Sequence, residues 1–189
     1  LGIIGCGRIG ENVARGAAAL GLRVVGYDQV MTVGPTGIKM VSLDQIWEQS
    51  DFITLHTPLT ETTKNLINAE TISKCKAGVY LVNCARGGII DELALLDALK
   101  SGKVAGAALD VYTSEPPGEK LSELIAHPNL ICTPHLGAST EEAQVTVAKD
   151  VAYQMCDVFD QKAYFGVLNV SYMESASQPA MKPFMKLAE

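Results

Sequence analysis

Short apolar runs rich in valine, isoleucine and leucine alternate with segments of helical period over most of this sequence. The runs are apolar on both faces, which is typical of parallel strands covered by helices on both sides. The order therefore predicts an α/β fold with a doubly wound parallel sheet, whose strands all end at one ligand-binding edge. We expect strands at 1–4, 23–27, 52–56, 79–84, 104–110 and 129–133, and helices at 8–20, 43–49, 69–75, 92–101 and from about 140.

The composition of the chain argues against some classes of binding partner. With 189 residues, 48% of them hydrophobic, the chain can bury a core the size of one large domain. Its formal net charge is -6, and no basic run is long enough to follow a phosphate backbone, so nucleic acid is not an expected partner. No apolar stretch approaches the roughly 18 residues of a membrane span. The five cysteines include no C-x-x-C pair, which favours reduced thiols and a cytoplasmic location.

The first expected strand runs directly into a G-x-G-x-x-G pattern, from Gly5 to Gly10, at the start of a helical segment. Glycines at these places let the backbone approach a pyrophosphate, whose charge is stabilised by the free N–H groups of the helix start. Such a pattern alone also arises for structural reasons, but Asp28 ends the next expected strand. A carboxylate there can accept hydrogen bonds from an adenosine ribose and repels a 2′-phosphate, so the sequence favours NAD over NADP.

An arginine follows the apolar run in VYLVNCARGG. The guanidinium of Arg86 is always charged and planar, which suits bidentate binding of a carboxylate or polarisation of a keto oxygen. A surface salt bridge is the alternative. Because the strand ends at the ligand-binding edge, we expect Arg86 to face a ligand, with Gly87 and Gly88 allowing a close turn.

The three histidines differ in their surroundings. His127 lies in a polar connection and His56 ends a strand; neither has a partner at metal-ligand spacing, and no metal site is expected. His135 follows the last expected strand, between a proline and a glycine, on the ligand-binding edge. Glu115, in VYTSEPP, can fix the tautomer of an imidazole and favour its charged form, as a general acid requires. A structural His135 and a solvated Glu115 are the alternatives on these residues alone.

Together these segments resemble the D-isomer-specific 2-hydroxyacid dehydrogenases. The resemblance runs through LGIIGCGRIG, HTPLTETTKNLI, VNCARGGIIDE, GAALDVYTSEPP and TPHLGAST, up to about residue 160. It implies that Arg86 binds the carboxylate and keto group of a small 2-hydroxy acid, that His135 exchanges the proton, and that Glu115 supports His135. It further implies that Asp110 lies near the nicotinamide carboxamide. The residues that it places along the NAD site are Gly5, Gly7, Arg8, Ile9, Gly10, Asp28, Thr57, Cys84, Ala85, Arg86, Asp110, His135, Leu136, Gly137 and Ala138.

The resemblance also implies a domain organisation. In this family the cofactor domain is inserted into a substrate domain made from both ends of the chain, which predicts an NAD-binding domain over 1–160 and an exit segment over 161–189. The sequence opens inside an expected strand, so we expect most of the substrate domain to lie outside it. A short strand is expected at 166–172, and Ser139 with Glu142 fits a capping box for the last helix.

Within the family, WEQSDFITLHTPLT, NCARGG and PHLGASTEEAQ are most similar to members that oxidise 3-phospho-D-glycerate with NAD at the start of serine biosynthesis. Two other functions stay open. One is reduction of glyoxylate, hydroxypyruvate or another 2-keto acid, and the other is a corepressor-like module that senses NAD. The resemblance implies a homo-oligomer for the full-length protein, with the last helix as a candidate contact. Alone, this chain is expected to bind NAD with little or no turnover.

Overall fold

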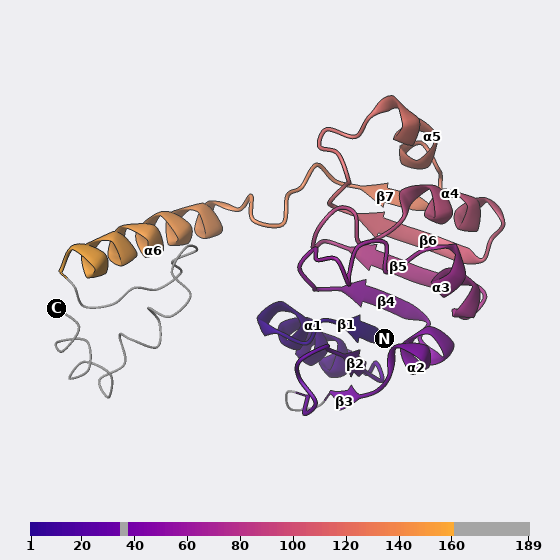
Figure 1. Cartoon of the computed structure of the whole chain (residues 1–189), viewed down its shortest axis with the longest axis horizontal. Coiled ribbons are helices and arrows are strands. Elements are labelled where there is room, and N and C mark those ends of the chain that lie inside the picture. Colours follow the sequence, from indigo (N-terminus) through magenta and orange to yellow (C-terminus); the bar gives the residue numbers. More distant parts are fainter. Residues whose placement is uncertain (35–37, 161–189) are drawn as a thin grey trace. The chain divides into compact units, whose positions relative to one another are not determined.

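The computed structural model describes residues 1–34 and 38–160 (Figure 1). The chain divides into two compact units, Leu1–Gly137 and Ala138–Glu189. The expected strand at 166–172 and the expected exit segment at 161–189 lie outside the described residues, and the domain boundary at residue 160 stays a prediction. Between residues 1 and 160, apart from 35–37, no helix is both long and apolar enough to cross a membrane.

One parallel sheet organises the first unit. Its strand order is β3-β2-β1-β4-β5-β6-β7, which reverses direction between β1 and β4 and confirms the predicted doubly wound α/β fold. All strands therefore end at the same edge, to which the candidate site residues belong. The strands are β1 Gly2–Ile4, β2 Val25–Tyr27, β3 Lys39–Met40, β4 Phe52–Leu55, β5 Val79–Asn83, β6 Val104–Leu109 and β7 Leu130–Cys132.

The helices begin where the sequence supplies capping side chains. Ser42 and Asn68 each form a complete capping box, and the Asp91 carboxylate accepts two N–H bonds at the start of its helix. These contacts satisfy backbone donors that have no partner within the helix. The helices are α1 Arg8–Ala19, α2 Leu43–Gln49, α3 Ala69–Lys74, α4 Glu92–Lys100, α5 Ser122–Ile125 and α6 Glu141–Phe159, with a 3₁₀ turn at Glu119–Leu121.

The start of α6 differs from the expectation. The N-cap is Thr140, whose hydroxyl accepts a hydrogen bond from the N–H of Ala143. The predicted capping box of Ser139 and Glu142 is therefore wrong. The helix begins one residue later than that box requires, and the alanine at its third position has no side chain to return the bond.

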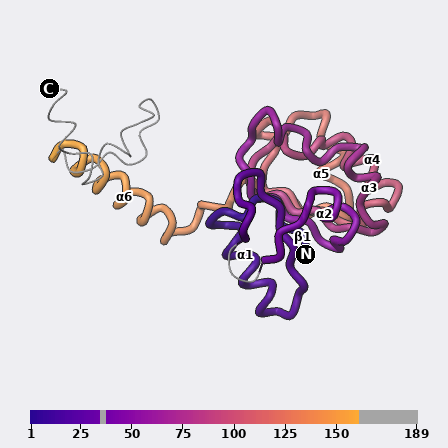
Figure 2. The backbone as a smooth tube through the Cα atoms, turned by 60° about the horizontal axis from the view of Figure 1, so that its bottom comes forward, coloured from indigo at the N-terminus to yellow at the C-terminus, as the bar shows by residue number. Residues whose placement is uncertain are grey.

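The core lies mainly on one face of the sheet. Because successive strand residues point to opposite faces, Ile4 joins a large cluster with Trp47 and Leu95, under α2 to α4, whereas Ile3 joins a small cluster with Ala14 under α1. Figure 2 shows α1 and α2 on opposite sides of β1. Each fully buried aliphatic side chain stabilises the fold by about 1.5–3 kcal/mol relative to an exposed one, so the larger cluster, with more such residues, contributes more to the stability of the sheet.

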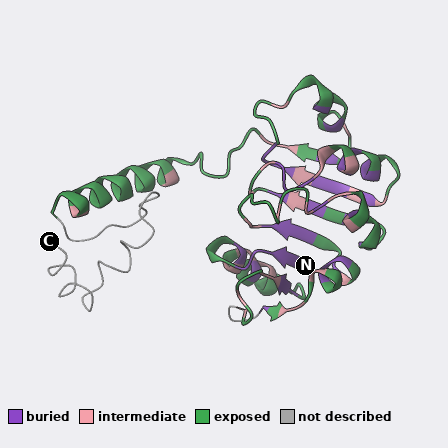
Figure 3. Ribbon diagram, viewed as in Figure 1, coloured by how far each residue is buried: buried purple, intermediate pink, exposed green. Residues whose placement is uncertain are grey.

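Within the first unit, no described helix covers the opposite face of β4 to β7. Phe52 and Tyr80 stack there with ring centroids 4.8 Å apart, and they are 43% and 42% exposed. Ile131 on β7 is 69% exposed, and Figure 3 shows exposed residues on all three strands. Among the described helices of the first unit, those that cover this part of the sheet therefore lie on one face only.

Candidate functional site

The glycine pattern forms a turn that fits a phosphate group. The N-cap of α1 is Gly7, and no side chain caps this helix, so its first N–H groups remain free for an anion. At Gly10 a Cβ atom would lie 2.1 Å from the carbonyl oxygen of Gly5, so only glycine lets the helix approach the strand. At Gly7 no described residue other than its neighbours along the chain has an atom within 4 Å of a Cβ position, which leaves room for a bound group.

A cavity of about 340 Å³ extends from this turn. Four of the predicted residues line it: Gly5, Gly7, Asp28 and Thr57. The Thr57 hydroxyl oxygen is buried without a hydrogen-bond partner in the described structure, an unsatisfied polar group beside the cavity. The sequence reasoning did not assign other lining residues to the site, among them Tyr27, Pro58, Thr60 and Thr63.

Asp28 stands at the cavity wall directly after β2. One carboxylate oxygen accepts the N–H groups of Val30 and Met31, at 2.9 and 3.1 Å, and the other accepts the N–H of Cys6 at 2.9 Å. Burial opposes ionisation of Asp28, but these hydrogen bonds outweigh it and lower the pKa of its carboxyl group. A carboxylate has about four acceptor positions, so the oxygen facing Cys6 keeps capacity for one more donor, as a ribose hydroxyl requires.

Asp110 repeats this arrangement directly after β6. Its Oδ1 accepts the Thr133 hydroxyl at 2.5 Å and the Leu136 N–H at 2.8 Å, and its Oδ2 accepts the Gly137 N–H at 2.9 Å. Burial raises the pKa of Asp110, but these hydrogen bonds lower it by more, so the group stays charged. The second oxygen again keeps acceptor capacity. Asp110 thus fastens the segment after β7 to the end of β6.

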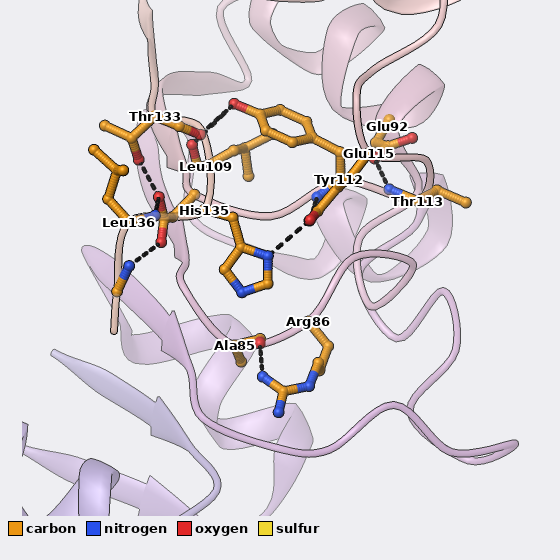
Figure 4. A network of polar contacts seen from close by, with 12 residues as sticks. Ala85, Arg86, Glu92, Leu109, Tyr112, Thr113, Glu115, Thr133, His135 and Leu136 are labelled. Carbon is orange, nitrogen blue, oxygen red and sulfur yellow. Dashed lines mark hydrogen bonds and ion pairs between the residues drawn. The ribbon is translucent and has the colours of Figure 1, made fainter. Parts of the chain in front are cut away.

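The fastened segment carries His135, whose φ of 58° lies in the left-handed region. Histidine is one of the few residue types enriched there. Its Nδ1 lies 2.7 Å from Oε2 of Glu115, while the other Glu115 oxygen accepts the Tyr112 N–H at 3.1 Å (Figure 4). The hydrogen bond from His135 is the main cause that lowers the pKa of Glu115. The structure therefore forms the predicted pair and leaves Nε2 outside it.

Arg86 lies at the end of β5, as predicted, on an exposed turn. The buried Asn83 fixes this turn, accepting the N–H of Ala85 at 3.0 Å and donating to the carbonyl of Arg86 at 2.9 Å. The guanidinium donates to the Ala85 carbonyl at 2.6 Å and forms no hydrogen bond with Glu115 or His135 (Figure 4). Arg86 thus shares the strand edge with the pair but is free to bind another group.

The remaining predicted residues of the first unit lie at the same edge, and Ala138 begins the second unit. Arg8, Ile9 and Cys84 are exposed, and the carbonyl of Ala138 accepts a hydrogen bond from Gln144. His56 contacts Thr54 through Nε2 at 3.0 Å, and burial lowers its pKa. The His127 ring accepts the N–H of Asn129. These two histidines therefore make local contacts.

Comparison with known proteins identifies the family. Residues 1–137 match the model of the D-isomer specific 2-hydroxyacid dehydrogenase NAD binding domain. Over its full length the chain is 48% identical to the D-3-phosphoglycerate dehydrogenase of Rattus norvegicus and 46% identical to that of Bacillus subtilis. It spans 36% of the length of each of these relatives.

A solved structure of a D-lactate dehydrogenase from Treponema pallidum is also similar. It is 38% identical, superposes with a TM-score of 0.82, and the match covers 89% of this chain and 55% of that one. The phosphate turn, the acidic residue after β2 and the open cavity agree with the cofactor that the family model names. The chain belongs to the D-isomer-specific 2-hydroxyacid dehydrogenases and contains their NAD-binding domain.

Proposed function

We propose that the complete protein carrying this chain oxidises 3-phospho-D-glycerate to 3-phosphohydroxypyruvate with NAD, at the first step of serine biosynthesis. The observation that carries the chemistry is the His135–Glu115 pair at 2.7 Å, on the strand edge where Arg86 and Asp110 also lie. The choice of substrate is supported by the 46–48% identity to the rat and Bacillus subtilis relatives.

Each of these side chains has a defined task in the proposal. Nε2 of His135 takes the proton of the C2 hydroxyl, while Glu115 holds Nδ1 and stabilises the imidazolium that results. Arg86 binds the substrate carboxylate through its planar donors. NAD, when bound, supplies the acceptor for the hydride that leaves C2 as the C=O bond forms.

The same proposal assigns the cofactor contacts. The turn from Gly7 to Gly10 holds the pyrophosphate, Asp28 accepts from the adenosine ribose, and Asp110 accepts from the nicotinamide carboxamide with its remaining capacity. Arg8, Ile9, Thr57, Cys84, Ala85 and the segment 135–138 complete the site. The proposal also includes a homo-oligomer and a cytoplasmic location, which light scattering and cell fractionation would check.

The deciding experiment compares substrates on the complete protein with NAD. Turnover of 3-phospho-D-glycerate well above that of lactate, glycerate and other unphosphorylated 2-hydroxy acids supports the proposal. Faster turnover of an unphosphorylated acid assigns the protein to another activity of the family. NAD binding without turnover of any 2-hydroxy acid favours a binding module.

Substitution of His135 tests its assigned role. In the complete protein, His135→Gln should reduce kcat by about 10²- to 10⁴-fold, the usual contribution of a general acid or base, and calorimetry should show NAD binding retained. His127→Gln is the matched control, because its ring accepts a local N–H bond from Asn129.

Substitution of Arg86 tests substrate binding. An Arg86→Ala variant of the complete protein should raise KM for the substrate and lower kcat, and unchanged kinetics would refute its role.

A further inference from the structure

Tyr112 connects the three segments that carry Arg86, Glu115 and His135. Its N–H donates to Glu115 at 3.1 Å. Its carbonyl oxygen would lie 1.8 Å from a Cβ atom at Gly87, so the arginine turn packs directly on the Tyr112 backbone. Its hydroxyl lies 3.2 Å from the carbonyl of Thr133, two residues before His135.

The hydroxyl is a buried donor with two acceptors. It lies 3.1 Å from the Leu109 carbonyl, at the end of β6, and 3.2 Å from the Thr133 carbonyl, just after β7, so its single proton is shared between them. Burial, and then contact with the Cys132 thiol, raise the pKa of Tyr112 above its ordinary value. The hydroxyl therefore keeps its proton over the pH range in which enzymes of this kind work.

This bond and the Asp110 contacts hold the same segment from different sides. Asp110 binds the Thr133 hydroxyl and the N–H groups that follow His135, whereas Tyr112 binds the backbone that precedes it. His135 lies between these attachments in a left-handed conformation, which persists only where surrounding contacts enforce it. Tyr112 therefore supplies one of the contacts that fix the backbone before His135, beside the Asp110 bond to the Thr133 hydroxyl, and its loss lets the ring shift relative to Glu115.

We propose that the Tyr112 hydroxyl is a positioning group that sets the distance between His135 and Glu115 and thereby the rate of proton transfer. This inference rests on the proposed role of His135. It gives Tyr112 no contact with substrate or cofactor. Tyr112 acts on the imidazole only through the Thr133 carbonyl, and on Glu115 only through its own backbone N–H.

The test is Tyr112→Phe, which removes one oxygen and keeps the ring. In the complete protein we expect kcat to fall by about 10- to 100-fold, as for a small misplacement of a reacting group, with KM and NAD affinity within about two-fold of wild type. In this chain alone, carbon NMR of the Glu115 carboxyl group should show its pKa rise toward the ordinary value, because the His135 bond that lowers it is weakened.

Tyr80→Phe is the matched control. The Tyr80 ring stacks on Phe52 on the open face of the sheet, away from the site. Removing the Tyr80 hydroxyl should change neither kcat nor the pKa of Glu115. Wild-type kcat and Glu115 titration in Tyr112→Phe would overturn the proposal, as would equal effects of the two variants. If the wild-type protein shows no turnover, the proposed function is refuted. The pKa of Glu115 then still tests whether the Tyr112 hydroxyl positions His135 against Glu115.

A second measurement covers a Tyr112→Phe variant that does not fold. With 3-fluorotyrosine at position 112, fluorine NMR should show the hydroxyl protonated at a pH where free 3-fluorotyrosine is ionised. Because burial is the main cause of the raised pKa of Tyr112, ionisation like that of the free amino acid would mean that the hydroxyl does not occupy the buried position from which it reaches the two carbonyl groups. That result also overturns the proposal.

Discussion

At the scale of single residues, two aspartates do the same work at two places. Asp28 and Asp110 each follow a strand directly, and each accepts three hydrogen bonds at the strand edge, Asp28 from the segments after β1 and β2 and Asp110 from the segment after β7. Each carboxylate therefore fixes a loop and keeps one acceptor position for a ligand. The groups that fix these loops are thus the same groups that would bind the cofactor.

Asp28 should set the choice between the two nicotinamide dinucleotides. We expect Asp28→Ser to weaken NAD binding by about 10-fold, the value of one hydrogen bond to a charged group, and to improve NADP binding relative to NAD because the repelling charge is gone. Calorimetry of this chain with both cofactors measures the change. Asp97→Ser, on an exposed position of α4, should leave both affinities unaltered, and a constant NAD to NADP ratio in Asp28→Ser would refute the assignment.

Because of the Asp110 contacts, the free energy of unfolding should depend on pH. The pKa of Asp110 is lower in the folded chain than its ordinary value of about 3.9, so its stabilising contribution is complete above that value and is lost as the pH falls through the folded pKa. We expect Asp110→Asn to lower the urea midpoint at pH 7 and the difference from wild type to shrink below about pH 4. A difference that does not vary with pH would contradict this reasoning.

Sequence reasoning found the residues whose role depends on their place at a strand end. Asp28, Arg86 and Asp110 follow apolar runs, and that position can be read directly. Tyr112 and Thr133 were missed because their role comes from a contact across 21 residues. Asn83 was missed although a polar residue closing the run VYLVN was a usable signal.

At the scale of elements, most helices and strands were predicted, including the three-residue strands β1, β2 and β7, whereas β3 and α5 were not. β3 has two residues and α5 has four, too few to show a period. The capping error at α6 has a similar cause, because Ser139 and Thr140 are both acceptable N-caps and only the geometry selects between them. Tertiary contacts, which local sequence does not contain, decide these details.

Two glycine substitutions should have opposite effects on stability. Gly87→Ala places a Cβ atom against the Tyr112 carbonyl, and we expect it to lower the free energy of unfolding by about 1–3 kcal/mol. Gly16→Ala, on the exposed side of α1 with no atom within 4 Å of the new Cβ, should raise it by about 0.5–1 kcal/mol. Urea denaturation measures both, and destabilisation by Gly16→Ala would refute the steric explanation.

At the scale of the whole molecule, cofactor binding should raise the free energy of unfolding, and a tryptophan in the core can report the change. Trp47 is the single tryptophan of the sequence and is only 2% exposed, so its fluorescence reports unfolding of the first unit. At NAD concentrations of about 100 times Kd, we expect the free energy of unfolding to rise by about 2.7 kcal/mol. NADP at the same concentration should produce a smaller rise, and an equal rise would show that Asp28 does not discriminate.

The open sheet surface with Phe52, Tyr80 and Ile131 should also affect the solubility of this chain. Association between molecules removes an exposed apolar surface from water, so such a patch promotes aggregation. Concentrated stocks of this chain should therefore turn cloudy sooner than its charge of -6 suggests. A lysine in place of Ile131, at the edge strand, should keep those stocks clear to higher concentration.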